Sequence, residues 1–114
     1  MNYLSVAGKH HNYRDENNQD AVLFKEKGDY CAMVLADGVS SCEQSRTGAF
    51  VSCEVITEFL LTHSKRLFLM EKQEIADSLI SVILFHLKKI AQNESHEIHD
   101  YASSLACVLY VQNK

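Results

Sequence analysis

The sequence of 114 residues contains no proline and only four glycines. The absence of proline excludes Pro-rich linkers and argues against low-complexity segments. None of the glycines forms a GxGxxG or Walker pattern, so the sequence contains no glycine-rich phosphate loop. A chain of this length is one domain or part of one, and it can bury about two-thirds of the surface that its unfolded state exposes.

Long runs of positive charge are also missing. The longest are the pairs Lys65-Arg66 and Lys88-Lys89, and the net charge of the chain is -4. Nucleic acid backbones attract a stripe of Lys and Arg side chains, and the sequence has no such stripe. We therefore expect no nucleic acid partner.

Apolar runs are short as well. The longest strongly apolar stretch, Leu79 to Leu87, is far below the length of a membrane span and ends at Lys88. Residues 1–9 contain no long apolar segment of the kind found in signal peptides. These features predict a cytoplasmic protein without membrane contact. Its cysteines form no CxxC pair, and we expect them to be reduced and mostly buried: Cys31, Cys42, Cys53 and Cys107.

Strand patterns occupy the first third of the chain and its end. Residues 2–7, 20–26, 30–36 and 101–111 have the pattern of strands, and residues 8–19 and 93–100 have the composition of polar loops. Lys27-Gly28-Asp29 predicts a hairpin turn between the second and third strands, because glycine adopts a positive φ at little cost.

Two helices are predicted between the third and fourth strands. Ser40 and Ser41 are each followed three residues later by Glu or Gln, which predicts a helix start near residue 42. A second helix is predicted over residues 72–92. Apolar residues recur at helical spacing in both: Ala49, Phe50, Cys53, Ile56, Thr57 and Leu60 in the first, and Ile75, Leu79, Val82, Ile83, Leu87 and Ile90 in the second.

The strands over 30–36 and 104–111 have apolar or small residues on both faces. A sheet with one face in water would show polar alternation instead. The sequence therefore predicts an α/β (α+β) fold with a predominantly antiparallel sheet, covered on one face by two helices, as half of an α-β-β-α sandwich. Because nothing visible covers the second face, we expect a homodimer in which two such faces stack.

Two aspartates are predicted to lie at strand ends. Asp20 opens the second strand, and Asp37 closes the third, where Gly38 follows. Hairpin pairing can bring these ends together, and two converging carboxylates repel each other unless a cation lies between them. Magnesium and manganese take oxygen ligands, and Gly38 has no Cβ to keep a metal from its carbonyl. Taken alone, an Asp-Gly after a strand is usually just a turn, and a Gln-Asp in a loop carries no functional signal.

Taken together, these segments resemble the metal-dependent protein phosphatases of the 2C type. The resemblance covers nearly all of residues 1–114, as the N-terminal half of the family's domain. It rests on the order and spacing of several segments: Asn18-Gln19-Asp20-Ala21, Val34-Leu35-Ala36-Asp37-Gly38, Ser40-Ser41, Gly48-Ala49 and Ala102-Ser103-Ser104-Leu105-Ala106.

The resemblance implies a serine/threonine protein phosphatase that acts on a phosphoprotein and uses two magnesium or manganese ions. It implies that Asp37 bridges both metals, that Gly38 offers its carbonyl, and that Asp20 acts close to the metals, often through water. A metal-activated water would then attack phosphorus without a covalent enzyme intermediate.

The family's phosphate-binding arginine has no exact counterpart. Arg14 is the candidate, although its spacing to Asp20 is about one residue too long, and His10 or His11 could take part of that role. Ser40-Ser41 replaces the usual glycine pair after Asp-Gly.

The later aspartates of the family site are also missing. Asp77 and Asp100 are the only aspartates after Asp37, and neither lies in a motif that resembles those ligands. Two functions therefore stay open. The chain is either part of a phosphatase catalytic domain, weakly active or inactive by itself, or a non-catalytic half-domain that self-associates or binds a partner.

Other patterns in the sequence are weaker. His96-Glu97-Ile98-His99 offers two histidines, but its spacing matches no closed zinc pattern, and loops often carry solvated histidines. Ser103-Ser104 lacks the Gly-x-Ser-x-Gly setting of a serine nucleophile.

Overall fold

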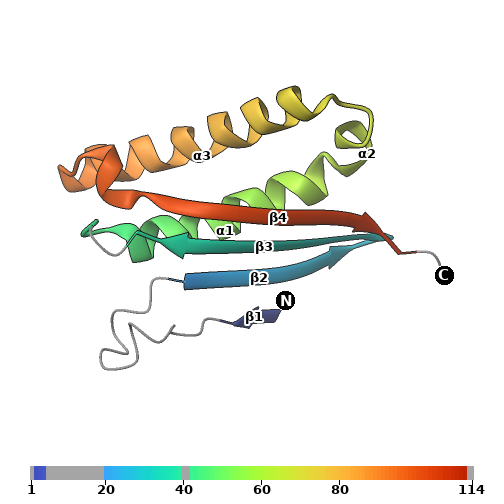
Figure 1. Ribbon diagram of the computed structural model, residues 1–114, viewed down its shortest axis with the longest axis horizontal. Helices are drawn as coiled ribbons and strands as arrows, with labels where there is room; N and C mark the ends of the chain where they lie inside the picture. Colours follow the sequence, from blue (N-terminus) through green and yellow to red (C-terminus); the bar gives the residue numbers. More distant parts are fainter. Residues whose placement is uncertain (1, 5–19, 40–41, 113–114) are drawn as a thin grey trace.

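Four antiparallel strands form one sheet in the computed structural model, which describes residues 2–4, 20–39 and 42–112. The strands lie in chain order across the sheet (Figure 1): β1 Asn2–Leu4, β2 Asp20–Lys27, β3 Tyr30–Gly38 and β4 Ser103–Val111. The prediction of an α+β fold with an antiparallel sheet is confirmed.

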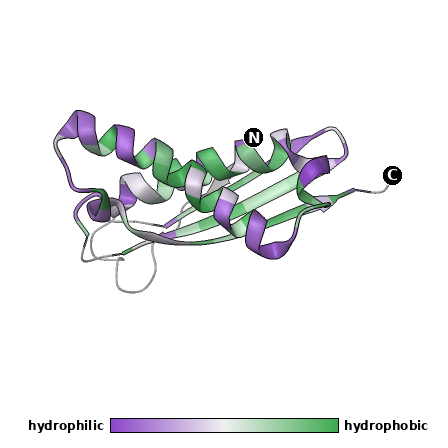
Figure 2. Ribbon diagram, turned by 90° about the horizontal axis from the view of Figure 1, so that it is seen from above, coloured by the Kyte–Doolittle hydropathy of each residue, from purple (hydrophilic) through white to green (hydrophobic). Residues whose placement is uncertain are grey.

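The helices all fall between β3 and β4. They are α1 Ser45–Thr62, α2 Ser64–Leu67, α3 Lys72–Glu94 and the 3-10 helix η3 Ile98–Tyr101. α1 contacts β2, β3 and β4, and α3 runs back along α1 in the opposite direction on the same side of the sheet (Figures 1 and 2). The sequence therefore predicted both long helices and the face that they cover, but neither α2 nor η3.

The β2–β3 hairpin fixes the register of the sheet. Gly28 has a φ of 61°, a left-handed conformation that costs glycine little, and the two-residue turn pairs Lys27 with Tyr30. Pairing then continues without a bulge to the other end of the hairpin, where Asp20 lies opposite Asp37. A two-residue turn between two uninterrupted strands determines every cross-strand pair along them.

The core lies between α1 and the sheet. Small residues on β3, including Ala32 and Ala36, let the helix approach closely, and both are fully buried. Cys53 of α1 lies against the sheet, where its thiol donates to the carbonyl oxygens of Ala21 at 3.5 Å and Val34 at 3.6 Å. Burial raises the pKa of Cys53 to about 11, so this cysteine is an inert core residue. All four cysteines are free.

The start of α1 differs from the prediction. The helix begins at Ser45, three residues later than expected, and its N-cap residue Gln44 makes no side-chain capping bond. The backbone N–H of Gln44 instead donates to the carbonyl of Asp100 at 2.8 Å, so the approach to α1 is set by tertiary contact with η3. The capping serines Ser40 and Ser41 and the predicted loop over 8–19 lie outside the described residues.

The face of β2, β3 and β4 that points away from the helices is called the open face here. Side chains alternate between the two faces of a strand, so the open face of β3 carries Cys31, Met33, Leu35 and Asp37. Met33, Leu35 and Val108 are exposed there at 43%, 51% and 55%. The apolar character of both faces is confirmed.

The contact of α1 with η3 depends on Gly48. A Cβ at this position would lie 1.9 Å from the backbone oxygen of Tyr101, which is itself almost fully buried. The helix and the core hold the backbone on both sides of this contact, so moving either segment would cost free energy.

We predict that Gly48→Ala lowers the free energy of unfolding by about 3 kcal/mol, because the added methyl group forces α1 away from η3. Urea denaturation followed by circular dichroism measures the change. Thr47→Ala is the matched control at the neighbouring exposed position. There the added alanine meets no steric conflict, and its higher helix propensity should raise the free energy of unfolding by a few tenths of a kcal/mol. Equal midpoints for wild type and Gly48→Ala would contradict the close contact.

Candidate metal centre

Two carboxylates meet on one cross-strand pair at the end of the β2–β3 hairpin. Asp20 is the first residue of β2, Asp37 is the second-to-last residue of β3, and the two are direct partners in the antiparallel register. Directly paired residues have Cβ atoms about 5 Å apart and point to the same face. Both side chains therefore belong to the open face, as the sequence predicted for a shared cation.

The environment of the two carboxylates differs. Asp20 is half-buried, and its Oδ1 atom has no contact with solvent, whereas Asp37 is exposed. Ser104 of β4 is the next residue along the same row of pairs, and its hydroxyl donates to the backbone oxygen of Asp37 at 3.5 Å. Asp20, Asp37 and Ser104 are called the carboxylate row below. It presents oxygen atoms from three strands.

The end of β3 is held on its other side by β4. Gly38 is buried and pairs with Ser103, and the N–H of Val39 donates to the carbonyl of Ala102 at 3.1 Å. Because the pairing continues past Asp37 on the β4 side, the backbone that carries this carboxylate is fixed by the sheet and not by a loop.

The row places two carboxylates directly opposite each other on one face of the sheet. Like charges directly opposite each other on a sheet are destabilising, and a divalent ion between them converts repulsion into attraction. Oxygen donors of this kind fit magnesium or manganese and not the softer metals that prefer sulfur. The residues that the structure describes contain no group of three or more His, Cys, Asp and Glu side chains able to hold a metal. Two carboxylates alone do not complete the six or more oxygen ligands that such an ion takes.

The remaining predicted site residues do not join the row. Arg14, His10 and His11 lie outside the described part of the chain. His96 is engaged elsewhere, with its Nδ1 2.7 Å from the hydroxyl of Tyr101.

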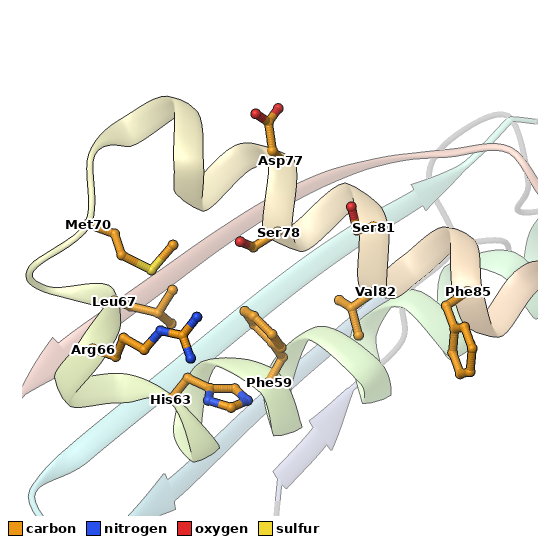
Figure 3. Close-up of a pocket in the computed structure, with 10 residues that line it drawn as sticks. All are labelled: Phe59, His63, Arg66, Leu67, Met70, Asp77, Ser78, Ser81, Val82 and Phe85. Carbon is orange, nitrogen blue, oxygen red and sulfur yellow. The ribbon is translucent and has the colours of Figure 1, made fainter.

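The cavity drawn in Figure 3 lies far from the carboxylates. It has a volume of about 490 Å³ and lies between the end of α1, α2 and α3. Its walls are mostly apolar, with Phe59, Val82 and Phe85 prominent, and Asp77 points away from it. The described residues that line this cavity include no cluster of three His, Cys, Asp or Glu side chains able to hold a metal.

A comparison with protein families identifies the family of the chain. A family model described as protein phosphatase 2C matches residues 7–114, which is nearly the whole chain. The chain belongs to the protein phosphatase 2C family. No curated protein and no solved structure matches it. Members of the 2C family are generally dependent on magnesium or manganese and act on phosphoproteins. Among the described residues, no helix has the length and apolar character needed to cross a membrane.

The sequence analysis of this 2C-family chain did not assign Ser104 to the row, and it did not use the turn to derive the pairing of Asp20 with Asp37. The turn at Gly28-Asp29 already fixes the pairing of Asp20 with Asp37, since counting outward from Lys27 and Tyr30 reaches them together. Ser104 could not be found this way, because a long helical connection separates β3 from β4 and leaves their register open.

We predict that Asp37→Asn raises the free energy of unfolding in EDTA by about 0.5 kcal/mol, because it removes the repulsion between paired carboxylates. The same variant should lose the stabilisation that MnCl₂ gives the wild type. Thermal unfolding with and without the metal measures both effects.

Asp77→Asn is the control, since Asp77 lies on α3 and accepts a hydrogen bond from Gln73 there. It should keep the manganese response. A manganese-induced stabilisation that persists in Asp37→Asn would place the ion elsewhere.

Proposed function

We propose that this chain supplies part of the catalytic centre of a metal-dependent serine/threonine protein phosphatase that hydrolyses phosphomonoesters of proteins. The observation that carries the proposal is the direct pairing of Asp20 with Asp37 on the open face. Membership of the protein phosphatase 2C family supports the same reaction class.

Each residue of the site has a distinct task in this proposal. Asp37, exposed at the end of β3, would hold the metal directly, and the carbonyl of Gly38 would add a ligand. Asp20, half-buried on β2, would act through water as an outer ligand. Arg14 would bind the phosphate of the substrate, because a planar guanidinium matches phosphate oxygens.

Two magnesium or manganese ions, when bound, supply an acidified water as the nucleophile and neutralise charge on the phosphoryl oxygens. The chain's own residues provide position. The sheet holds the two carboxylates at a fixed separation, and Ser104 holds the backbone at Asp37 through its hydroxyl. Such fixed placement avoids reorganisation during the reaction, which is the main protein contribution to catalysis of this type.

We predict slow, manganese-dependent hydrolysis of 4-nitrophenyl phosphate by the chain, and a loss of at least about tenfold in Asp37→Asn, because the variant removes a metal ligand and its charge. Release of 4-nitrophenol measures the rate. Asp77→Asn should retain the wild-type rate. If the wild type shows no manganese-dependent hydrolysis, the chain is inactive by itself; the enzymatic proposal fails if Asp37→Asn also leaves manganese binding unchanged.

A non-catalytic role is the alternative, and the apolar open face is the observation that favours it. Met33, Leu35 and Val108 are all exposed on neighbouring strands, and Tyr110 adds a fourth apolar surface at 39% exposure. Contiguous apolar patches of this kind mark interaction surfaces. In this alternative the chain forms a homodimer through two stacked open faces, or binds a partner there.

We predict that the chain sediments as a dimer at micromolar concentration and that Leu35→Lys returns it to the monomer mass of 12.9 kDa, because a charge in the stacked face cannot be solvated. Ile80→Lys is the control, since Ile80 is 55% exposed on α3, away from the sheet. A wild-type monomer at these concentrations would exclude the homodimer.

A further inference from the structure

A second pocket lies at the end of β2 opposite to Asp20. It has a volume of about 390 Å³ and is formed where the β2–β3 turn meets the junction of α1 with α2. Four groups that carry or can carry positive charge line it: Lys27, His63, Lys65 and Arg66. They are called the basic pocket here. No carboxylate is among the described residues that line it, in a chain whose net charge is -4.

Among the residues that the structure describes, the three permanent cations of the basic pocket have no acidic partner. Within the described ranges, neither Lys27, Lys65 nor Arg66 forms an ion pair. Lys25 provides the contrast, since it lies on the same side of β2 and pairs with Glu58 of α1. Charges that the fold leaves uncompensated around one cavity create a positive potential there, which attracts anions.

The fold brings these cations together for structural reasons. Lys27 is two residues beyond Lys25, so strand alternation places it on the helix-facing side of β2. α1 ends at Thr62 above it, and α2 then presents Lys65 and Arg66. Leu61 and Leu67 are buried on either side of this junction, and the rings of Tyr30 and Phe68 lie 6.0 Å apart. The helix junction is therefore anchored to the sheet by core packing.

The shape and composition of the pocket suit an oxyanion with an organic group attached. A guanidinium grips phosphate oxygens as a fork, and lysine ammonium groups add point charge. The volume falls in the range of small-molecule sites and leaves room beyond the anion itself. Arg66 and His63 also border the apolar cavity of Figure 3, where their side chains lie beside Phe59. An apolar group next to the phosphate would find a surface there.

We propose that the basic pocket binds the phosphomonoester group of a phosphorylated protein segment. Seven residue steps along β2 separate Lys27 from Asp20, or about 23 Å, and the two lie on opposite faces of the sheet. A phosphate in the basic pocket is therefore not the one that the carboxylate row would hydrolyse. It is a second phosphorylated residue that docks the substrate. The choice of a phosphorylated protein as its source rests on the proposed function, whereas the anion site itself does not.

The test is a titration of the ¹⁵N-labelled chain with inorganic phosphate in EDTA. Without metal the carboxylate row repels phosphate, so any binding reports on other sites. The amide signals of Gly28, Ser64 and Lys65 should shift. Lys27→Gln and Lys65→Gln should each weaken binding about fivefold, since each removes one charge at a solvent-exposed site. Lys88→Gln, the same change on the far part of α3, should leave it unaltered.

The second arm compares a phosphoserine peptide with its unphosphorylated form. The phosphopeptide should shift the same signals, bind more tightly than inorganic phosphate and be displaced by it, whereas the unphosphorylated peptide should not bind. Shifts that avoid the pocket, or equal weakening by Lys65→Gln and Lys88→Gln, would overturn the anion site. A phosphopeptide no tighter than inorganic phosphate would overturn the docking role. Neither result depends on phosphatase activity, so the two proposals fail separately.

Discussion

The pairing of Asp20 with Asp37 is the constraint on which the functional account depends. A turn with glycine at its positive-φ position sets the register of β2 against β3, and that register brings two negative charges to adjacent positions on one face. The arrangement is unfavourable for the sheet alone, since like charges oppose each other there. Local arrangements that destabilise a fold are expected mainly at functional sites, where a bound ligand can relieve the repulsion.

Much of the fold could be predicted from local sequence patterns. The hairpin turn, the two long helices and the antiparallel sheet were all predicted, because glycine at a turn and apolar spacing along a helix need no tertiary knowledge. The start of α1 and the helices α2 and η3 were not. The backbone N–H of Gln44 bonds to Asp100, more than fifty residues away, and Gly48 packs on the backbone of Tyr101. Such contacts between distant segments override the capping signals, and no pattern in the local sequence indicates them.

The candidate site shows the same division. Asp20, Asp37 and Gly38 could be proposed from sequence, and the turn even fixes their pairing. Ser104 joins them only through the β3–β4 register, which a long helical connection hides. The basic pocket was equally invisible, because Lys27 and the Lys65-Arg66 pair meet only after α1 has crossed the sheet. The open face joins two of the proposed roles, since the apolar residues that could stack in a dimer lie beside Asp37 on β3. Stacking and substrate access would therefore compete for one surface.

Paramagnetic broadening by manganese tests the central claim most directly. At a small fraction of one Mn²⁺ per chain, the account predicts that the amide signals of residues 20, 37 and 104 weaken first, because the ion lies between the ends of β2 and β3. Signals at the other end of the hairpin, such as Gly28, should stay sharp. Early broadening around His96 and His99, or uniform broadening along the chain, would show that the paired carboxylates are not a metal site.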